Sequence, residues 1–240
     1  MFSGTYLDYY LMGIILIPGL ILAIIAQARV TKAFNKYSQV MSMRGLTGSE
    51  LARKILDEAD LQNVEVVRTE GTLTDNYNPK TKTLSLSDAV YSSSSVASLG
   101  VAAHEVGHAI QHKEGYLPAK IRSILVPITN LISHLLWPLV MLGLLFNFGA
   151  ETGGNVGNIF LWSGVILFGA AVLFSLITLP VEFDASKRAK KLMLETNVID
   201  EMEVDGAKKV LNAAALTYVA SLVVAILNLI RFILVARRRN

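Results

Sequence analysis

The chain has 240 residues, of which 52% are hydrophobic and only 17% are charged. Soluble domains carry about 25% charged residues, so this composition excludes an ordinary soluble protein and favours a membrane protein. The net charge of +3 is too small to indicate nucleic acid, and we expect no such partner. Because the chain has no cysteine, any metal site must use histidine or carboxylate ligands.

Four apolar runs are long enough to cross a bilayer, which takes about 20 residues. The prolines inside them are tolerated more often in membrane helices than in soluble ones. We expect the first run to be a retained anchor, because its leading residues contain no lysine or arginine and no small-residue cleavage site follows. The runs are residues 6–28, 124–148, 156–181 and 211–236.

The polar segment after the first run predicts a small α+β domain, at residues 29–122. Residues 46–61 have the pattern of an amphipathic helix that begins with a capping box formed by Thr47 and Glu50. The pattern then predicts a strand in 63–71, a turn at 76–82, a strand at 83–87 and a helix over about 89–112. The second strand, TLSLS, is a candidate edge strand that could pair with an extended substrate.

The expected organisation is therefore that of a mostly α membrane protein with about four transmembrane helices and one small α+β domain. Pro180 is expected to start a helix after the third run, with Glu182 in its first turn. Around the α+β domain we place an N-terminal transmembrane anchor at 1–28, two transmembrane helices at 123–181, a polar helix at 182–210, and a C-terminal transmembrane helix with a basic tail at 211–240.

Lysine and arginine residues predict the orientation in the membrane, because cytoplasmic loops carry an excess of them. The short connection at 149–155 has none, whereas both longer polar segments are basic, which predicts an outside N-terminus and both polar segments in the cytoplasm. Four crossings put the basic tail at 237–240 outside, against the same rule. Either the fourth run does not fully cross the membrane, or the charges beside the first three runs determine the orientation against those of the tail. The lysine and arginine residues that support this orientation are Arg29, Lys32, Lys36, Arg44, Lys113, Lys120, Arg122, Lys187, Arg188, Lys190 and Lys191.

Three of the four histidines lie in the segment AAHEVGHAIQH at 102–112. His104 and His108 are four residues apart, which on a helix places both imidazoles on one face, within reach of one tetrahedral ion. Glu105 lies next to His104, where it can reach a metal-bound water without binding the metal. This H-E-x-x-H pattern predicts a Zn²⁺ site with Glu105 as general base.

His112 is not expected to be the third metal ligand. A regular helix puts it about 12 Å along the axis from His104. The protease class with a third histidine on the same segment needs a glycine-mediated bend, and Gln111 and Glu114 occupy its glycine and histidine positions. His112 is therefore expected to support the site from behind or to lie at the exposed end of the helix.

The third ligand must come from another segment, and VEFDASKRA at 181–189 offers two carboxylates. Glu182 shares a helix face with Ser186, while Asp184 points about 200° away. The alternative interpretation is that Glu182 is a carboxylate favoured by the dipole at a helix start.

Together, AAHEVGHAIQH, NYNPKTKTLSLS and VEFDASKRA resemble the YugP-like family of bacterial membrane zinc metallopeptidases, over nearly the whole chain. The chain is more distantly similar to the gluzincin-type heat-shock and CAAX-prenyl membrane proteases, whose later E-[FY]-x-A-D motif supplies the third zinc ligand. That resemblance implies Glu182 as the ligand and a zincin-like domain. Ser186 stands where those relatives have an aspartate that orients a histidine ligand.

The resulting prediction is a multi-pass protein of the bacterial plasma membrane that hydrolyses peptide bonds. Zn²⁺ is held by His104, His108 and Glu182, and Glu105 is the general base for the zinc-activated water. The active site is expected in the cytoplasm near the membrane surface, with membrane or misfolded proteins as substrates. Two alternatives stay open: an intramembrane site-2-type protease, and a non-catalytic metal-binding membrane scaffold.

Overall fold

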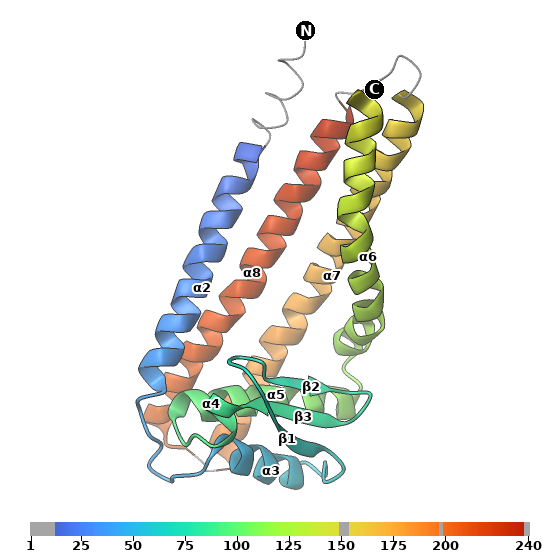
Figure 1. Ribbon diagram of the computed structural model, residues 1–240. Helices are drawn as coiled ribbons and strands as arrows, with labels where there is room; N and C mark the ends of the chain where they lie inside the picture. Colours follow the sequence, from blue (N-terminus) through green and yellow to red (C-terminus); the bar gives the residue numbers. More distant parts are fainter. Residues whose placement is uncertain (1–12, 149–153, 197–198, 238–240) are drawn as a thin grey trace. The chain divides into compact units, whose positions relative to one another are not determined.

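The protein is mostly helical and has one small sheet, as the computed structural model of residues 13–148, 154–196 and 199–237 shows (Figure 1). The start of the first apolar run and the tail at 238–240 lie outside the described residues, as does most of the 149–155 connection. The elements are η1 (Ile14–Leu16), α2 (Ile17–Tyr37), α3 (Gly48–Glu58), β1 (Glu65–Thr69), β2 (Asn76–Asn78), β3 (Thr83–Ser87), α4 (Asp88–Tyr91), α5 (Val96–Glu114), α6 (Leu117–Phe148), α7 (Gly154–Glu195) and α8 (Glu201–Arg237).

Among the described residues, four helical segments are long and apolar enough to cross a membrane. They lie in the η1–α2 segment and in α6, α7 and α8, which matches the four apolar runs of the sequence. The chain divides into two compact units. The helical unit comprises residues 1–25, 122–178 and 218–240, and the α+β unit comprises residues 26–121 and 179–217.

The helical unit is held together by apolar packing between its helices. Gly143 on α6 lets the side chain of Leu161 on α7 approach closely, since a Cβ there would lie 3.1 Å from it. Gly19 on α2 is similarly close to Leu227 on α8, at 2.9 Å. The buried cluster of this unit is Leu136, Val140, Leu161, Val165, Phe168, Phe232 and Ala236.

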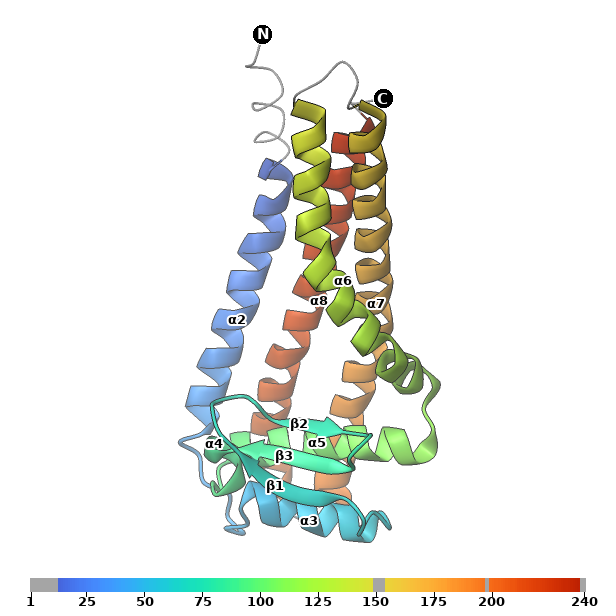
Figure 2. The same cartoon turned by 45° about the vertical axis from the view of Figure 1, so that its right-hand side comes forward.

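The sheet of the α+β unit has the order β1-β3-β2, with β3 parallel to β1 and antiparallel to β2 (Figure 2). The strand TLSLS is therefore β3, the middle strand, and the expectation that it forms a free edge is wrong. Residues 76–78 were expected in a turn but form β2, and this strand is an edge of the sheet. The turn itself is present directly afterwards, where the side-chain oxygen of Asn78 accepts hydrogen bonds from the backbone N–H groups of Lys80 and Thr81.

The first helix of the α+β unit begins as the sequence predicts. The Thr47 hydroxyl accepts a hydrogen bond from the Glu50 backbone N–H at 3.3 Å, and the Glu50 carboxylate accepts one from the Thr47 N–H at 2.8 Å. This capping box satisfies two N–H groups that have no partner within the helix.

The core of the α+β unit joins the buried face of α3, the inward residues of β3 and most of α5. Parts of α7 and α8 complete it, which explains why the segments 26–121 and 179–217 form one unit. Core residues from these elements include Leu51, Ile55, Leu56, Leu84, Leu86, Leu99, Val106, Ala189, Met193, Ala207 and Leu211.

Three helix boundaries differ from the sequence prediction. The expected polar helix at 182–210 is divided between the end of α7, at Glu195, and the start of α8, at Glu201. The expected helix over 89–112 is divided into α4 and α5, because Ser95 caps the start of α5 by accepting a hydrogen bond from the Ser98 N–H at 3.2 Å. Pro180 does not start a helix but lies inside α7, which runs unbroken past it. A proline removes one backbone hydrogen bond, and a long helix packed on both sides of it tolerates that loss.

Candidate metal centre

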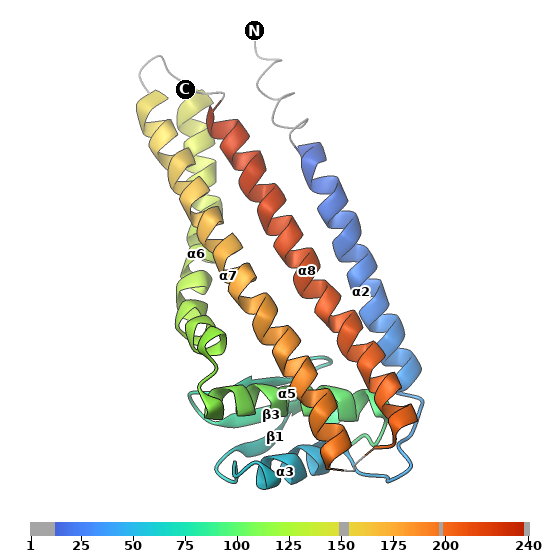
Figure 3. The same ribbon diagram turned by 180° about the vertical axis from the view of Figure 1, so that it is seen from behind.

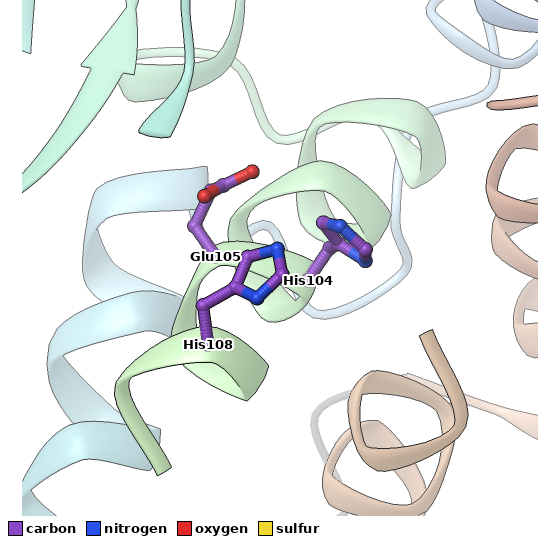
Figure 4. Close-up of side chains that lie close together, drawn as sticks. All are labelled: His104, Glu105 and His108. Atoms are coloured by element: carbon purple, nitrogen blue, oxygen red, sulfur yellow. The ribbon is translucent and has the colours of Figure 1, made fainter. Parts of the chain in front are cut away.

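Helix α5 carries His104, Glu105 and His108 in its middle turns. Both imidazoles lie on the same side of α5, with ring centroids 4.8 Å apart, and the Glu105 carboxylate lies beside them (Figure 4). The possible ligand atoms of the three residues are all within 4.8 Å of one another. The spacing of the H-E-x-x-H pattern thus produces the convergence expected from a 3.6-residue turn.

The end of α7 lies against α5 at this level (Figure 3). A Cβ atom on Gly107 would lie only 2.7 Å from the backbone oxygen of Ala185, so the two helices touch backbone to backbone. Small residues at a crossing allow this close approach, and here Gly107 faces Ala185. The contact brings the preceding turn of α7, which carries Glu182, to the two histidines.

Glu182 is buried, with 1% of its surface exposed, and it faces both imidazoles. Its Oε2 atom is 3.2 Å from Nε2 of His104 and 3.5 Å from Nε2 of His108. Because Pro180 is internal to α7, Glu182 is not in a first helical turn, and the interpretation based on a helix-start dipole no longer applies. A buried carboxylate at this depth needs positive charge or hydrogen bonds to compensate its lost hydration.

These three atoms fit a zinc ion. Ligand atoms that bind one tetrahedral Zn²⁺ at about 2.0–2.1 Å lie about 3.3 Å from one another. The measured separations of 3.2 and 3.5 Å are close to that value. Two imidazole nitrogens and one carboxylate oxygen are also the donor set used by catalytic zinc sites that leave a fourth position open.

Each imidazole has a partner at its other nitrogen. Nδ1 of His104 is 3.2 Å from the hydroxyl of Ser186, and Nδ1 of His108 is 3.0 Å from the side-chain oxygen of Gln111. Such partners fix the orientation of a metal-binding histidine. Ser186, on α7, is therefore the residue that contacts His104 from the other helix.

Asp184 bonds to other side chains of the two helices rather than to an imidazole. Its Oδ2 atom accepts hydrogen bonds from Gln111 at 2.8 Å and from Arg188 at 2.5 Å. The carboxylate that the structure brings to the two histidines is therefore Glu182.

His112 lies outside the group of possible ligands. Its Nδ1 atom is 3.0 Å from the hydroxyl of Tyr77 on β2, so it links α5 to the edge strand of the sheet. Burial raises the pKa of Tyr77, which keeps this phenol protonated near neutral pH.

Sequence reasoning missed Gln111 as a residue of the site. It is fully buried and contacts both His108 and α7. The available signal was a long polar side chain one turn after His108, in a helix whose other buried residues, apart from Glu105, are small or apolar.

The comparisons with known proteins agree with the site. Over 211 residues, the chain is 44% identical to "Putative membrane protease YugP" from Bacillus subtilis (strain 168), covering 88% of this chain and 89% of that protein. No solved structure matches the chain. Residues 12–237 match the model of the family described as "Putative neutral zinc metallopeptidase". With nearly its whole length matched, the chain belongs to this zinc metallopeptidase family.

Proposed function

We propose that the protein is a membrane-embedded zinc endopeptidase. The observation that carries this proposal is the convergence of three donor atoms, Nε2 of His104, Nε2 of His108 and Oε2 of Glu182, from two helices distant in sequence. Their spacing suits one zinc ion, and family membership and the name of the relative point to the same chemistry.

The proposed roles follow from these positions. His104, His108 and Glu182 hold Zn²⁺, which supplies Lewis acidity: it lowers the pKa of a water molecule and polarises a carbonyl. Glu105 does not bind the metal in this scheme. It lies beside the histidines on α5 and accepts a proton from the attacking water, then donates it to the leaving amine. Its burial keeps bulk water from competing for that proton.

The same proposal assigns roles to the regions of the chain. Residues 29–122 form the catalytic α+β domain, 182–210 supply the third ligand, and the segments 1–28, 123–181 and 211–240 anchor the protein in the bilayer. Because 26–121 and 179–217 form one compact unit, both polar segments must lie on one side of the membrane, which supports their shared placement. The charge pattern supports the proposal that this side is the cytoplasm of a bacterial cell.

Labelling of introduced cysteines tests this orientation. The chain has no cysteine of its own, and Thr72 and Glu195 are exposed residues in the two polar segments. Thr72→Cys and Glu195→Cys should resist a membrane-impermeant thiol reagent in intact cells and react after lysis. Reaction of either one in intact cells contradicts the cytoplasmic placement.

The proposed substrates are polypeptides, in particular membrane or misfolded proteins that reach a site close to the bilayer. The bilayer is the other partner, and no nucleic acid is expected. A protease for unfolded segments has a simple substrate in vitro, because an unfolded chain such as casein offers extended peptide bonds without a specific sequence.

Glu105→Gln tests the chemistry. Glutamine keeps the size and the hydrogen-bonding reach of Glu105 but cannot accept the proton. Casein cleavage should fall by about 10²–10⁴-fold, the usual contribution of a general base. Zinc content, measured by elemental analysis on wild type and variant in parallel, should stay at one ion per chain.

The outcomes also separate the two alternatives. A metal-binding scaffold predicts zinc in both proteins and no cleavage by either. An intramembrane protease of the site-2 type predicts cleavage only of transmembrane substrates, and typically takes an aspartate ligand from a membrane segment. The last three apolar runs contain no aspartate. Equal casein cleavage by wild type and Glu105→Gln would show that the activity does not use this site.

A further inference from the structure

The side chain of Gln111 makes three hydrogen bonds, and two of them tie the two helices of the site together. It lies on α5 and is fully buried. Its Nε2 atom donates to the backbone oxygen of Val181 and to Oδ2 of Asp184, both at 2.8 Å. Its Oε1 atom lies 3.0 Å from Nδ1 of His108.

The partners on α7 leave only one orientation for the Gln111 amide. A backbone carbonyl accepts hydrogen bonds but cannot donate them, and the same is true of an ionised carboxylate. Asp184 is paired with the guanidinium of Arg188 at 2.5 Å, and Arg188 is paired in turn with Glu114 at 2.6 Å. Because both neighbours on α7 are acceptors, the NH₂ group of Gln111 must face them and its oxygen must face His108.

The amide orientation decides which nitrogen of His108 carries the proton. The oxygen of Gln111 can only accept, so Nδ1 of His108 must be the donor. In the neutral imidazole, Nε2 then carries the lone pair, and Nε2 is the atom that faces Glu182. That atom is therefore ready to bind a metal.

His104 is held by other partners: its Nε2 atom lies 3.2 Å from the carboxylate oxygen Oε2 of Glu182. Its Nδ1 atom contacts the hydroxyl of Ser186, which can donate or accept. The two Nδ1 atoms thus have different kinds of partner. That of His108 faces an amide oxygen, which can only accept, and that of His104 faces a hydroxyl, which can donate or accept.

We propose that Gln111 is a positioning residue that transmits the geometry of α7 to His108 and holds its imidazole in the Nδ1–H tautomer before a metal arrives. The inference rests on the proposed function in treating His108 as a metal ligand. It goes further by assigning the preset histidine and the residue that presets it.

The tautomer can be measured without metal or substrate. Full-length protein labelled with ¹⁵N-histidine, purified in detergent and stripped with a chelator, gives separate nitrogen shifts for protonated and lone-pair nitrogens, and His108→Gln identifies the resonances of His108. We expect a protonated Nδ1 and a lone-pair Nε2 at His108 in the wild type. An Nε2–H tautomer or a mixture at His108 would overturn the proposal.

Zinc affinity gives the second measurement, by competition with a chromophoric chelator. Gln111→Leu keeps the approximate volume but removes the acceptor, and partners of metal-binding histidines typically contribute 10–100-fold to metal affinity. We expect a loss in that range. Ser98→Ala is the matched control, since it removes side-chain hydrogen bonds of another fully buried polar residue on α5, whose partners are Ser93 and Ser95 rather than residues of the site. Its zinc affinity should equal that of the wild type.

The outcomes separate this inference from the proposed function. Wild-type zinc affinity in a folded Gln111→Leu protein would overturn the role of Gln111, whatever the protease activity. If Gln111→Leu does not fold, the ¹⁵N measurement on the wild type decides alone. A protein with the expected tautomer and zinc affinities that cleaves no peptide would refute only the protease function.

Discussion

The helical unit and the α+β unit use their polar side chains differently. In the helical unit, the hydroxyls of Ser133, Ser163 and Ser175 each donate to a carbonyl four residues earlier in the same helix. In the α+β unit, Gln111 and Ser186 instead contact side chains on a different helix. A hydroxyl bonded to its own helix fixes nothing beyond that helix, whereas a polar contact across helices fixes their relative placement. The difference teaches that polar contacts fix the relative placement of helices where α5 meets α7.

Substitutions at three positions on α7 give the strongest test of this difference between the two units. Glu182→Ala removes a proposed metal ligand, so zinc affinity should fall by more than about 100-fold, beyond the effect of altering a ligand's partner. Asp184→Ala removes one acceptor of Gln111 and should cost about tenfold. Thr178→Val, one turn before Glu182 but in the helical unit, keeps the shape and should leave the affinity unchanged.

Chelator competition on the three purified variants measures these affinities, with circular dichroism to confirm helix content. A larger loss for Asp184→Ala than for Glu182→Ala would reverse the choice of the third ligand. A loss for Thr178→Val comparable to either would show that the two units do not differ in the way described.

Two glycines sharpen the comparison at the level of packing. Gly107→Ala puts a Cβ 2.7 Å from the Ala185 oxygen, so α5 and α7 must separate. Overpacking of this kind costs about 1–3 kcal/mol, and it also shifts Glu182 away from the histidines. Gly169→Ala, in the helical unit, meets no atom within 4 Å and should be neutral or stabilising by up to about 1 kcal/mol.

Thermal unfolding in detergent and chelator competition measure both properties. Gly107→Ala is expected to lower the melting temperature and the zinc affinity together, and Gly169→Ala to lower neither. A Gly107→Ala protein with wild-type zinc affinity would show that the close approach of the helices does not set the metal geometry.

Much of the fold follows from local signals in the sequence. The described parts of the four apolar runs are helical, and the capping box at Thr47 and the strands β1 and β3 are present, because each depends on one contiguous stretch of sequence. The convergence of His104 with His108 follows in the same way from helical spacing. The separation of α4 from α5 at Ser95 does not follow from these signals, which predict one helix over about 89–112.

The missed features depend on contacts between distant segments. Pro180 has the local signature of a helix start, yet packing carries α7 through it. The strand β2 has a turn-like sequence and is extended because β3 lies beside it. Gln111 belongs to the site only because Val181 and Asp184 lie opposite, about 70 residues later in the chain. No local pattern contains that information, whereas the motif resemblance of EFDAS pointed to Glu182.

The smallest expected effect concerns a threonine in each unit. Thr47→Ala removes the cap of α3 in the α+β unit and should lower the free energy of unfolding by about 0.5–2 kcal/mol. Thr129→Ala, in the helical unit, removes a hydroxyl that donates to carbonyls of its own helix, and we expect a change within about 0.5 kcal/mol. Denaturant unfolding monitored by circular dichroism measures both variants.

The pH dependence identifies the cap as the cause. Hydrogen bonds from the backbone N–H and side chain of Thr47 lower the pKa of Glu50 below its ordinary value of 4.5. A group whose pKa is lowered by folding stabilises the protein above its unfolded pKa, and that contribution is lost as the pH falls through the folded pKa. The difference between wild type and Thr47→Ala should therefore be full near neutral pH and shrink in acid below about pH 4. The Thr129→Ala difference has no such carboxylate behind it and should stay constant. Zinc affinity should not change in either variant, because the hydrogen bonds of these two threonines go to residues outside the candidate metal centre. A pH-independent loss in Thr47→Ala would mean that the hydroxyl stabilises α3 through the hydrogen bond it accepts from the Glu50 backbone N–H rather than through its bond to the Glu50 carboxylate.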